Sequence, residues 1–287
     1  MTGDVYRVRT PAKLNIRLKV IGKRPDGYHE VVTLMVPVSI SDTLEFRLTG
    51  REGELTLTCE GYGVPEDETN LVLLAARQFL SETGLRAGIS ITLKKKIPVA
   101  AGMGGGSSDA AATLTALNEL FSRPLAAEGL YRLARGLGAD VPFFLYNRPC
   151  LARGIGEILE PLESWPAFWY VIVKPPIQVA TSWAYGSLKL RLTGDEYGYI
   201  KRFLGGKQFS LKQVLENDLE EVTAARYPII EKIKGHLSLE GAEGALMTGS
   251  GPGVFGIFRR REKAARACDK LREKRWGEVF LTTDWQP

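Results

Sequence analysis

A glycine-rich stretch at residues 98–114, PVAAGMGGGSSDAAATL, has the composition of an anion-binding loop. Glycine lets backbone N–H groups converge on a ligand because no Cβ blocks the approach. The helix expected to start behind it, capped by Ser107, Ser108 or Asp109, adds partial positive charge at its N-terminus. The stretch lacks the Gly-Lys-Ser/Thr of a P-loop, and no acidic residue follows at the spacing of a dinucleotide fingerprint. A flexible surface loop is the alternative, but such a loop would not run straight into an apolar helix, so we predict a phosphate cradle.

Lys13 and Asn15, in PAKLNIRL, lie two residues apart on an expected strand. They therefore share one face of that strand. If this face lines a binding site, an ammonium group and an amide reach the same ligand. Without further context the residues favour an ordinary solvated strand face.

Asp140 stands in GADVPFF, between Gly138 and Pro142. A carboxylate held stiffly beside an apolar run and partly desolvated is suited to act as a general base. A helix-ending or turn aspartate is equally compatible with these residues.

The segment RPDGYHE, residues 24–30, contains a Pro-Asp-Gly turn that presents Tyr28 and His29. An aromatic ring beside a hydrogen-bonding imidazole suits a planar base as ligand. A polar turn with a packed tyrosine is the even alternative.

A second glycine-rich stretch, MTGSGPG at residues 247–253, falls between two expected strands rather than between a strand and a helix. This context argues against a dinucleotide fingerprint. Its three glycines indicate close backbone approach, either to a ligand or to the first glycine loop. The basic run Arg259–Arg261 fits a solvated strand end better than a nucleic-acid patch.

The elements that must position these residues mix strands and helices without strict alternation, which favours an α+β fold over a doubly wound parallel sheet. In the first half we expect mostly strands in the first third and helices among the strands that follow. Strands 44–48 and 55–59 are expected to pair as a hairpin. In the second half we expect a loop at 175–187 and a basic amphipathic helix near the C-terminus. The expected strands are 12–20, 31–40, 44–48, 55–59, 89–98, 168–173, two that flank 248–253, and 278–283; the expected helices are 71–83 (capped by Asn70 and stopped at Gly84), 110–121, 130–138, 216–227, 228–237 and 263–274.

The bulk composition is ordinary for a soluble globular protein. The chain has 287 residues, enough for two domains, with 44% hydrophobic and 25% charged residues and a net charge of +5. This mild balance does not indicate a nucleic-acid binder. The three cysteines, Cys59, Cys150 and Cys268, have no metal-ligand spacing and suit a reducing compartment. The N-terminal residues have no apolar core of a signal peptide, and no run approaches membrane-spanning length, so we expect a cytoplasmic protein without a membrane partner.

Taken together, PAKLN, PVAAGMGGGSSDAA and MTGSGPG resemble, in this order, the three motifs of the GHMP kinase superfamily. The segments PAKLNIRLKVIGKRPDGYHE, GADVPFF and ARGIGEILEPL are similar to the branch whose acceptor is 4-diphosphocytidyl-2-C-methyl-D-erythritol, in the non-mevalonate isoprenoid pathway. The likeness covers nearly the whole chain and is least informative from about 188 to 215. It implies a two-domain α+β GHMP kinase fold, with an S5 domain 2-like ATP-binding domain at 1–150, a ferredoxin-like domain at 151–287 that contributes to the substrate site, and the active site in the cleft between them.

The resemblance also implies a reaction and its residues. ATP, with Mg²⁺, would phosphorylate the C2 hydroxyl of the acceptor; Asp140 would be the general base and Lys13 the assisting cation. The phosphate loop and nucleoside contacts would come from Pro98, Val99, Ala100, Ala101, Gly102, Met103, Gly104, Gly105, Gly106, Ser107, Ser108, Lys96 and Asn70. The acceptor would meet Asn15, Tyr28, His29, Thr181 and Tyr185, with cytosine between the two tyrosines. The protein would be a monomer or weak homodimer, and the resemblance leaves the Mg²⁺ ligands unassigned.

Two residues depart from the pattern. Asp109 stands where asparagine is frequent in the family, and its charge would repel phosphate unless it caps the helix or helps to place Mg²⁺. Trp183 falls within the proposed cytidine site. Another small-molecule kinase of the superfamily, and a non-catalytic nucleotide- or RNA-binding module, are the two rival interpretations.

Overall fold

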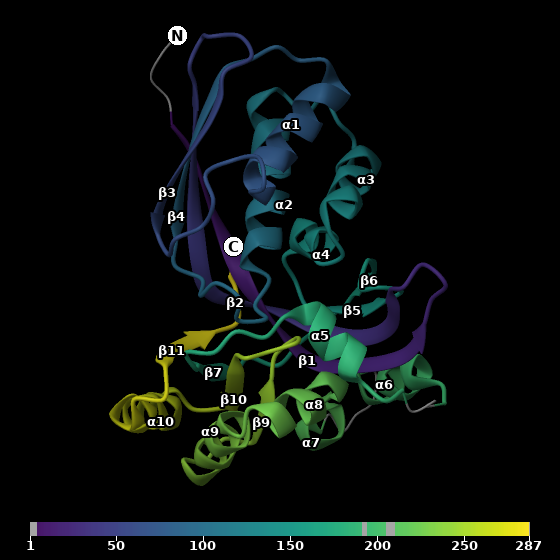
Figure 1. The fold of residues 1–287 in the computed structure, drawn as a ribbon, viewed down its shortest axis with the longest axis vertical. Coiled ribbons are helices and arrows are strands. Elements are labelled where there is room, and N and C mark those ends of the chain that lie inside the picture. Colours follow the sequence, from purple (N-terminus) through teal and green to yellow (C-terminus); the bar gives the residue numbers. More distant parts are fainter. Residues whose placement is uncertain (1–4, 191–193, 205–209, 287) are drawn as a thin grey trace. The chain divides into compact units, whose positions relative to one another are not determined.

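The computed structural model describes residues 5–190, 194–204 and 210–286 (Figure 1). The chain divides into two compact units that interleave in sequence. The first comprises Ile40–Val99, Gly104–Asn147 and the N-terminal segment up to Ala12. The second comprises Lys13–Ser39, Ala100–Met103 and the chain from Arg148 onwards. The two longest strands therefore contribute to both units. The predicted functional domains, an ATP-binding domain at 1–150 and a second domain at 151–287, are a separate division of the chain and stay a prediction.

In the first unit four strands follow the order β3-β4-β2-β1. Helix α2 packs against α1, α3 and α4. The elements are β1 (Tyr6–Lys23), β2 (His29–Leu48), β3 (Leu55–Gly61), β4 (Ile89–Lys95), α1 (Leu71–Thr83), α2 (Gly105–Leu120), α3 (Ala127–Leu137) and α4 (Val141–Tyr146), of which β1 and β2 continue into the second unit.

The predicted hairpin of 44–48 with 55–59 is wrong. Strand β3 pairs with β4 in parallel, and β4 lies between β3 and β2. A parallel pair needs a crossover connection, which α1 supplies between β3 and β4. Proximity in sequence favoured the hairpin, but β4, with Ile89, Ile91 and Leu93 buried, lies between the two strands.

The boundaries predicted for α1 are confirmed. Asn70 caps the helix, because its Oδ1 accepts a hydrogen bond from Val72 N at 2.9 Å. Gly84 ends it in the left-handed conformation, with φ at 68°. Both residues were recognisable from their types alone.

The second unit has two groups of strands. One contains the parts of β1 and β2 that lie within Lys13–Ser39. There β8 pairs with β1, β5 pairs with β2, and β6 pairs with β5. The other is a four-stranded sheet of order β11-β7-β10-β9. The remaining elements are β5 (Cys150–Arg153), β6 (Ile158–Pro161), β7 (Trp169–Lys174), α5 (Thr181–Ser187), α6 (Glu196–Leu204), α7 (Leu211–Val214), β8 (Glu216–Asn217), α8 (Asp218–Arg226), α9 (Ile229–Leu239), β9 (Gly244–Met247), β10 (Val254–Phe258), α10 (Arg261–Lys274) and β11 (Glu278–Thr283).

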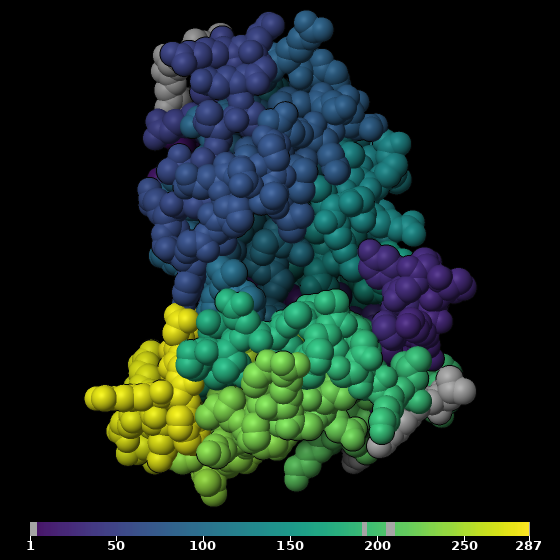
Figure 2. Space-filling model, in the orientation of Figure 1, coloured from purple at the N-terminus to yellow at the C-terminus, as the bar shows by residue number. Residues whose placement is uncertain are grey.

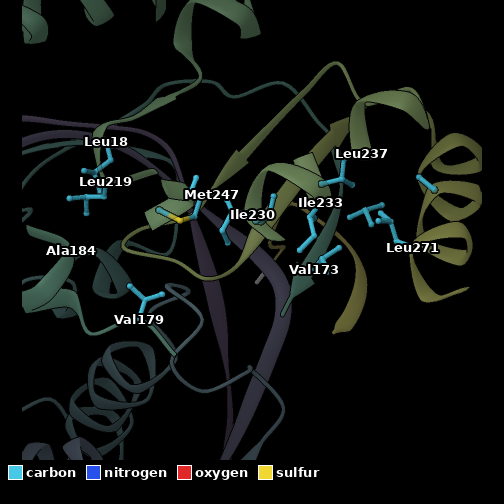
Figure 3. Close-up of a cluster of buried hydrophobic side chains, with 14 of the residues drawn as sticks. Leu18, Val173, Val179, Ala184, Leu219, Ile230, Ile233, Leu237, Met247 and Leu271 are labelled. Carbon is cyan, nitrogen blue, oxygen red and sulfur yellow. The ribbon is translucent and has the colours of Figure 1, made fainter. Parts of the chain in front are cut away.

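The core of the second unit lies between this sheet and α9 and α10. Ile230, Ile233 and Leu237 recur at helical spacing on α9 and are fully buried. Figure 3 shows them near Val173 of β7. The sheet, and with it the turn between β9 and β10, is therefore held by tight apolar packing.

Most elements predicted for the second half are confirmed, including the amphipathic α10, whose charged face lies on the surface (yellow in Figure 2). The loop predicted at 175–187 is wrong in part, because α5 forms at Thr181–Ser187. Ala184 anchors this helix in the core with no exposed surface. In the part of the chain that the structure describes, no helix is both long and apolar enough to span a bilayer.

Candidate active site

Helix α2 begins earlier than the sequence indicated. Gly104 takes the N-cap position with φ at 69°, and the helix starts at Gly105. The predicted cap at Ser107, Ser108 or Asp109 is wrong, since all three lie inside the first turns. Glycine at position 104 makes the earlier start possible because the left-handed conformation costs it little. The first N–H groups of a helix have no intrahelical partner, so this turn presents free donors to an anion.

Two further features of the turn suit a ligand. Gly106 is exposed, and a Cβ there would meet only Leu71 Cδ1, at 3.6 Å. The Ser108 hydroxyl is 1% exposed and, within the described residues, has no hydrogen-bond partner. A buried hydroxyl without a protein partner is unusual in a folded protein, so Ser108 is suited to bond a ligand atom or an ordered water.

Asp109 is turned into the first unit and neither caps α2 nor faces solvent. Its Oδ1 accepts from Thr10 Oγ1 at 2.8 Å, and its Oδ2 accepts from Lys95 Nζ at 2.8 Å. Lys95 also pairs with Asp42, and the three charged side chains are almost fully buried. Burial raises the pKa of Asp109 to about 7, against the opposing attraction of Lys95.

Lys13 and Asn15 are buried in the second unit, with 4% and 2% of their surface exposed. The solvated strand face that the residues alone favoured is therefore wrong. Lys13 Nζ donates to Asn15 Oδ1 at 2.5 Å, and Asn15 Nδ2 donates to Thr33 Oγ1 at 2.9 Å. Thr33 in turn donates to the carbonyl of Arg17 at 2.6 Å. This chain of hydrogen bonds fixes the orientation of the lysine.

The second glycine-rich turn packs on the first glycine stretch, as one of the two predicted alternatives required. Gly253 N donates to Ala101 O at 3.2 Å, and Thr248 Oγ1 donates to Gly102 O at 3.3 Å. A Cβ on Gly102 would lie 2.2 Å from Thr248 O, and one on Gly253 would lie 2.6 Å from Ala101 O. The glycines are thus needed for backbone contact.

The same turn supports the Lys13 strand. Asn15 N donates to Thr248 Oγ1 at 3.0 Å, and Lys13 N donates to Met103 O at 2.9 Å. Residues from all three sequence motifs therefore meet within the second unit.

Asp140 lies at the N-cap position of α4 in the first unit and is partly buried. Its side chain makes no capping hydrogen bond, so the carboxylate is not committed to closing the helix. Pro142 in the first turn of α4 restricts the backbone that carries it.

Of the predicted acceptor residues, the structure brings His29 and Tyr185 together. Their ring centroids are 5.1 Å apart with planes tilted by 31°. Burial, and secondarily Lys23, lowers the pKa of His29. Thr181 Oγ1 lies 3.0 Å from Ser250 Oγ, which links α5 to the second glycine-rich turn.

Tyr28 differs from these residues because 59% of its surface is exposed. It follows Gly27, whose φ of 89° forms the turn. Trp183 packs against Tyr227 and lies 4.6 Å from the Arg226 guanidinium carbon. Its ring is therefore engaged in protein packing rather than left for a base.

The residues predicted near the nucleoside lie in the first unit. Lys96 is exposed, and its backbone N donates to Asp42 Oδ1 at 2.5 Å. Pro98 is buried and Val99 is 39% exposed. Both ends of the Asn70 amide already make local hydrogen bonds, to Val72 N and Pro65 O.

Sequence reasoning missed the buried cluster of Asp42, Lys95 and Thr10 around Asp109. One signal was available: in β4 the buried positions are Ile89, Ile91, Leu93 and Lys95, so alternation assigns Lys95 to the apolar face. A lysine on that face needs a buried acidic partner.

Comparisons with known proteins agree with the family resemblance. The family "GHMP kinases N terminal domain" matches residues 70–148, and "GHMP kinases C terminal" matches residues 204–276. The chain is 45% identical to 4-diphosphocytidyl-2-C-methyl-D-erythritol kinase of Syntrophus aciditrophicus over 96% of its own length and 98% of that protein. It is 46% identical to the protein of the same name from Geobacter metallireducens, over 92% and 93% of the two chains.

Solved structures give the same relation. A crystal structure of 4-(cytidine 5'-diphospho)-2C-methyl-D-erythritol kinase matches with a TM-score of 0.81 and 35% identity, covering 98% of this chain and all of the other. Homoserine kinase from Cytophaga hutchinsonii matches with a TM-score of 0.78 at 21% identity, over 98% and 95% of the two chains, which shows a shared fold.

Proposed function

Because the chain belongs to the 4-diphosphocytidyl-2-C-methyl-D-erythritol kinase family of GHMP kinases, we propose that it transfers the γ-phosphoryl group of ATP to the C2 hydroxyl of that acceptor. The two-domain α+β fold is that of the GHMP kinases, and the chain is a small-molecule kinase.

The first turn of α2 would hold the phosphates. The N–H groups of Gly105, Gly106 and Ser107 point out of the helix start, where the helix dipole favours negative charge. The Ser108 hydroxyl, which has no hydrogen-bond partner within the described residues, would donate to a phosphate oxygen or to a water that accompanies the nucleotide.

Lys13 would stabilise the charge that develops on the transferring group or orient the acceptor hydroxyl. A preorganised ammonium in a water-poor site is worth far more than one in bulk water. Lys13 is buried, and Asn15 holds its ammonium group in one place. This buried pair, in a motif shared with the superfamily, is the observation that carries the proposal.

Asp140 would act as the general base. It would accept the proton of the C2 hydroxyl while that oxygen forms a bond to the γ-phosphorus and the bond to the β-phosphate oxygen breaks, giving ADP. Its partial burial, and the restriction that Pro142 places on the backbone beside it, support this role.

The acceptor's cytidine would lie against Tyr28, His29, Thr181 and Tyr185, with Asn15 nearby. Stacked aromatic rings supply apolar contact and fix the plane of a base. The pairing of His29 with Tyr185 supports this assignment. On the nucleotide side, the loop from Pro98 to Ser108 together with Lys96 and Asn70 would bind ATP.

Mg²⁺ is expected to accompany ATP. Among the described residues, no group of three or more His, Cys, Asp or Glu side chains could hold a metal ion. This fits a magnesium ion carried mainly by phosphate oxygens and water, since Mg²⁺ retains several waters in kinase sites. Such an ion would neutralise phosphate charge during transfer.

We further propose that residues 1–150 form the ATP-binding domain and residues 151–287 contribute to the acceptor site. The deciding experiment is ATP turnover by the purified chain with and without the cytidine acceptor. We expect ADP release that depends on the acceptor and a 2-phosphorylated product by mass spectrometry. Turnover with another acceptor alone would favour a different small-molecule kinase, and no acceptor-dependent turnover would refute the proposal.

A further inference from the structure

We propose that Lys95 is a positioning residue for the phosphate-binding turn, held beneath Gly105 by the buried carboxylates of Asp42 and Asp109. The inference deepens the proposed function and rests on it, because it assumes that the start of α2 binds the phosphates of ATP.

The first observation is how the three side chains are joined. Lys95 Nζ donates to Asp109 Oδ2 at 2.8 Å and to Asp42 Oδ2, and the three side chains have between 0% and 4% of their surface exposed. Thr10 Oγ1 donates to the second oxygen of Asp109. Buried charges persist only where partners satisfy them, so this geometry leaves the ammonium little freedom.

The second observation is where the ammonium lies. A Cβ on Gly105 would be 2.7 Å from Lys95 Nζ and 3.0 Å from Ile97 Cγ2. Lys95 therefore supports the first residue of α2 from below. Asp109, one turn further along α2, ties the same helix to the same ammonium.

The third observation concerns the chain that leaves β4. Asp42 Oδ1 accepts from Lys96 N at 2.5 Å and from Ile97 N at 2.8 Å. One carboxylate thus fixes the end of β4 while its partner across the lysine fixes the start of α2. The cluster clamps both ends of the segment that carries the glycine loop.

The charge balance explains why positioning, rather than added positive charge, is the role. Two carboxylates face one ammonium, so the cluster supplies no net positive charge toward phosphate. Burial and the neighbouring Asp42 both favour the protonated form of Asp109, whose pKa is raised to about 7, and a proton there brings the cluster to neutrality. A neutral, rigid support lets the backbone N–H groups set the site's affinity for the anion.

Lys95→Met tests the inference, with Lys94→Met as the matched control on the same strand. Lys94 pairs with Glu45 on the other face of β4 and is 39% exposed. We expect Lys95→Met to raise KM for ATP about tenfold, because misplaced donors weaken phosphate binding, and to leave KM for the acceptor within about twofold. Lys94→Met should leave both constants within about twofold.

Lys95→Met strands two buried carboxylates, so a second pair of variants guards against misfolding. Asp109→Asn keeps an oxygen that can accept from Lys95 or Thr10, whereas Asp109→Ala removes both contacts. We expect Asp109→Ala to raise KM for ATP about tenfold and Asp109→Asn to keep it within about twofold of wild type.

The outcomes separate this inference from the proposed function. Absence of acceptor-dependent turnover in the wild-type chain would refute the function itself. An active wild type with an unchanged KM for ATP in folded Lys95→Met and Asp109→Ala would refute the positioning role alone. So would equal rises in the KM values of both substrates.

Discussion

At the start of α2, a methyl group on Gly106 would meet only Leu71 Cδ1, at 3.6 Å, whereas in the turn between β9 and β10 a methyl group on Gly253 would lie 2.6 Å from Ala101 O. Both segments are glycine-rich, but their glycines face different things. At Gly106 the space is open to solvent, and the first N–H groups of the helix have no intrahelical partner. In the other turn the space is filled by backbone from the first glycine stretch, and Gly253 N is bonded to it.

A glycine-rich motif can therefore serve either of two roles. It can give a ligand access to the backbone, or it can let one backbone segment pack closely on another. The following element separates them. A glycine segment that opens a helix leaves unpaired N–H groups at its end. A glycine turn between antiparallel strands pairs its backbone groups within the sheet and its neighbours. Substitutions should therefore change kinetics near α2 and stability near the second turn.

The largest effect tests the chemistry assigned to the first unit. Asp140→Asn should lower kcat by about 10² to 10⁴, because the amide cannot take the proton of the acceptor hydroxyl. The melting temperature and the affinity for ATP should stay close to wild type, because asparagine has nearly the size and shape of aspartate and can still accept a hydrogen bond. Stopped-flow or coupled ADP assays measure kcat, and calorimetry measures ATP binding. Near-wild-type turnover would remove Asp140 from the mechanism.

The next largest effect is expected in the second unit, where Lys13 is proposed to supply a cation to the reaction although the nearby glycine turn serves packing. Lys13→Met should lower kcat by about 10², because a preorganised cation near the transferring group is lost. Lys19→Met is the control: Lys19 is on the same face of β1, is 7% exposed and pairs with Glu216 and Asp218. It should lower stability but leave kcat within about threefold. Equal losses of kcat in the two variants would mean that only the strand's integrity matters.

One substitution in each glycine-rich segment compares the two segments directly. Gly253→Ala should lower the free energy of unfolding by about 1–3 kcal/mol, because the new methyl group would clash with backbone that cannot rotate away. Gly106→Ala should keep or raise the melting temperature, since alanine is the better helix former, while KM for ATP rises about tenfold as the methyl group crowds the phosphates. Denaturant titrations and steady-state kinetics measure the two quantities. The reverse pattern would contradict our distinction between the segments.

The contrast between the segments also marks how far sequence reasoning reached. The strand on each side of MTGSGPG was recognisable from its apolar runs, and so was the close backbone approach. The start of α2 was placed too late, because Ser107, Ser108 and Asp109 are better N-cap residues than Gly104 in isolation. In the structure the left-handed Gly104, followed by Gly105 and Gly106, begins the helix despite those side-chain preferences.

Long-range relations were beyond local pattern. The parallel pairing of β3 with β4 needs the crossover that α1 supplies, and nothing in the residues of β3 alone specifies it. The burial of Lys13 and Asn15 depends on Thr33 and Thr248, which lie 18 and 233 residues from Asn15. The cluster at Lys95 needed Thr10, Asp42 and Asp109 from three other elements. Candidate site residues could be chosen from residue type, whereas the contacts that support them could not be predicted.

The smallest expected effects concern Tyr28 and Tyr185, which belong to neither glycine-rich segment and are proposed to bind the acceptor's base. Tyr28→Ala and Tyr185→Ala should each raise KM for the cytidine acceptor by roughly three- to tenfold, as expected for the loss of one aromatic stack, with less change in KM for ATP. Their stabilities should differ. Tyr28 is 59% exposed, so its removal should leave the melting temperature unchanged, whereas Tyr185 packs on His29 and on the core of the second unit.

Steady-state kinetics with each substrate varied in turn, together with thermal melts, measure both effects. Phenylalanine at either position is the matched control, because it keeps the ring and loses only the hydroxyl. Phenylalanine variants with near-wild-type KM, beside alanine variants with raised KM for the acceptor alone, would assign the rings to base stacking. Equal rises for ATP and acceptor would instead mean that the tyrosines support the fold of the second unit, and that the acceptor's base is bound elsewhere.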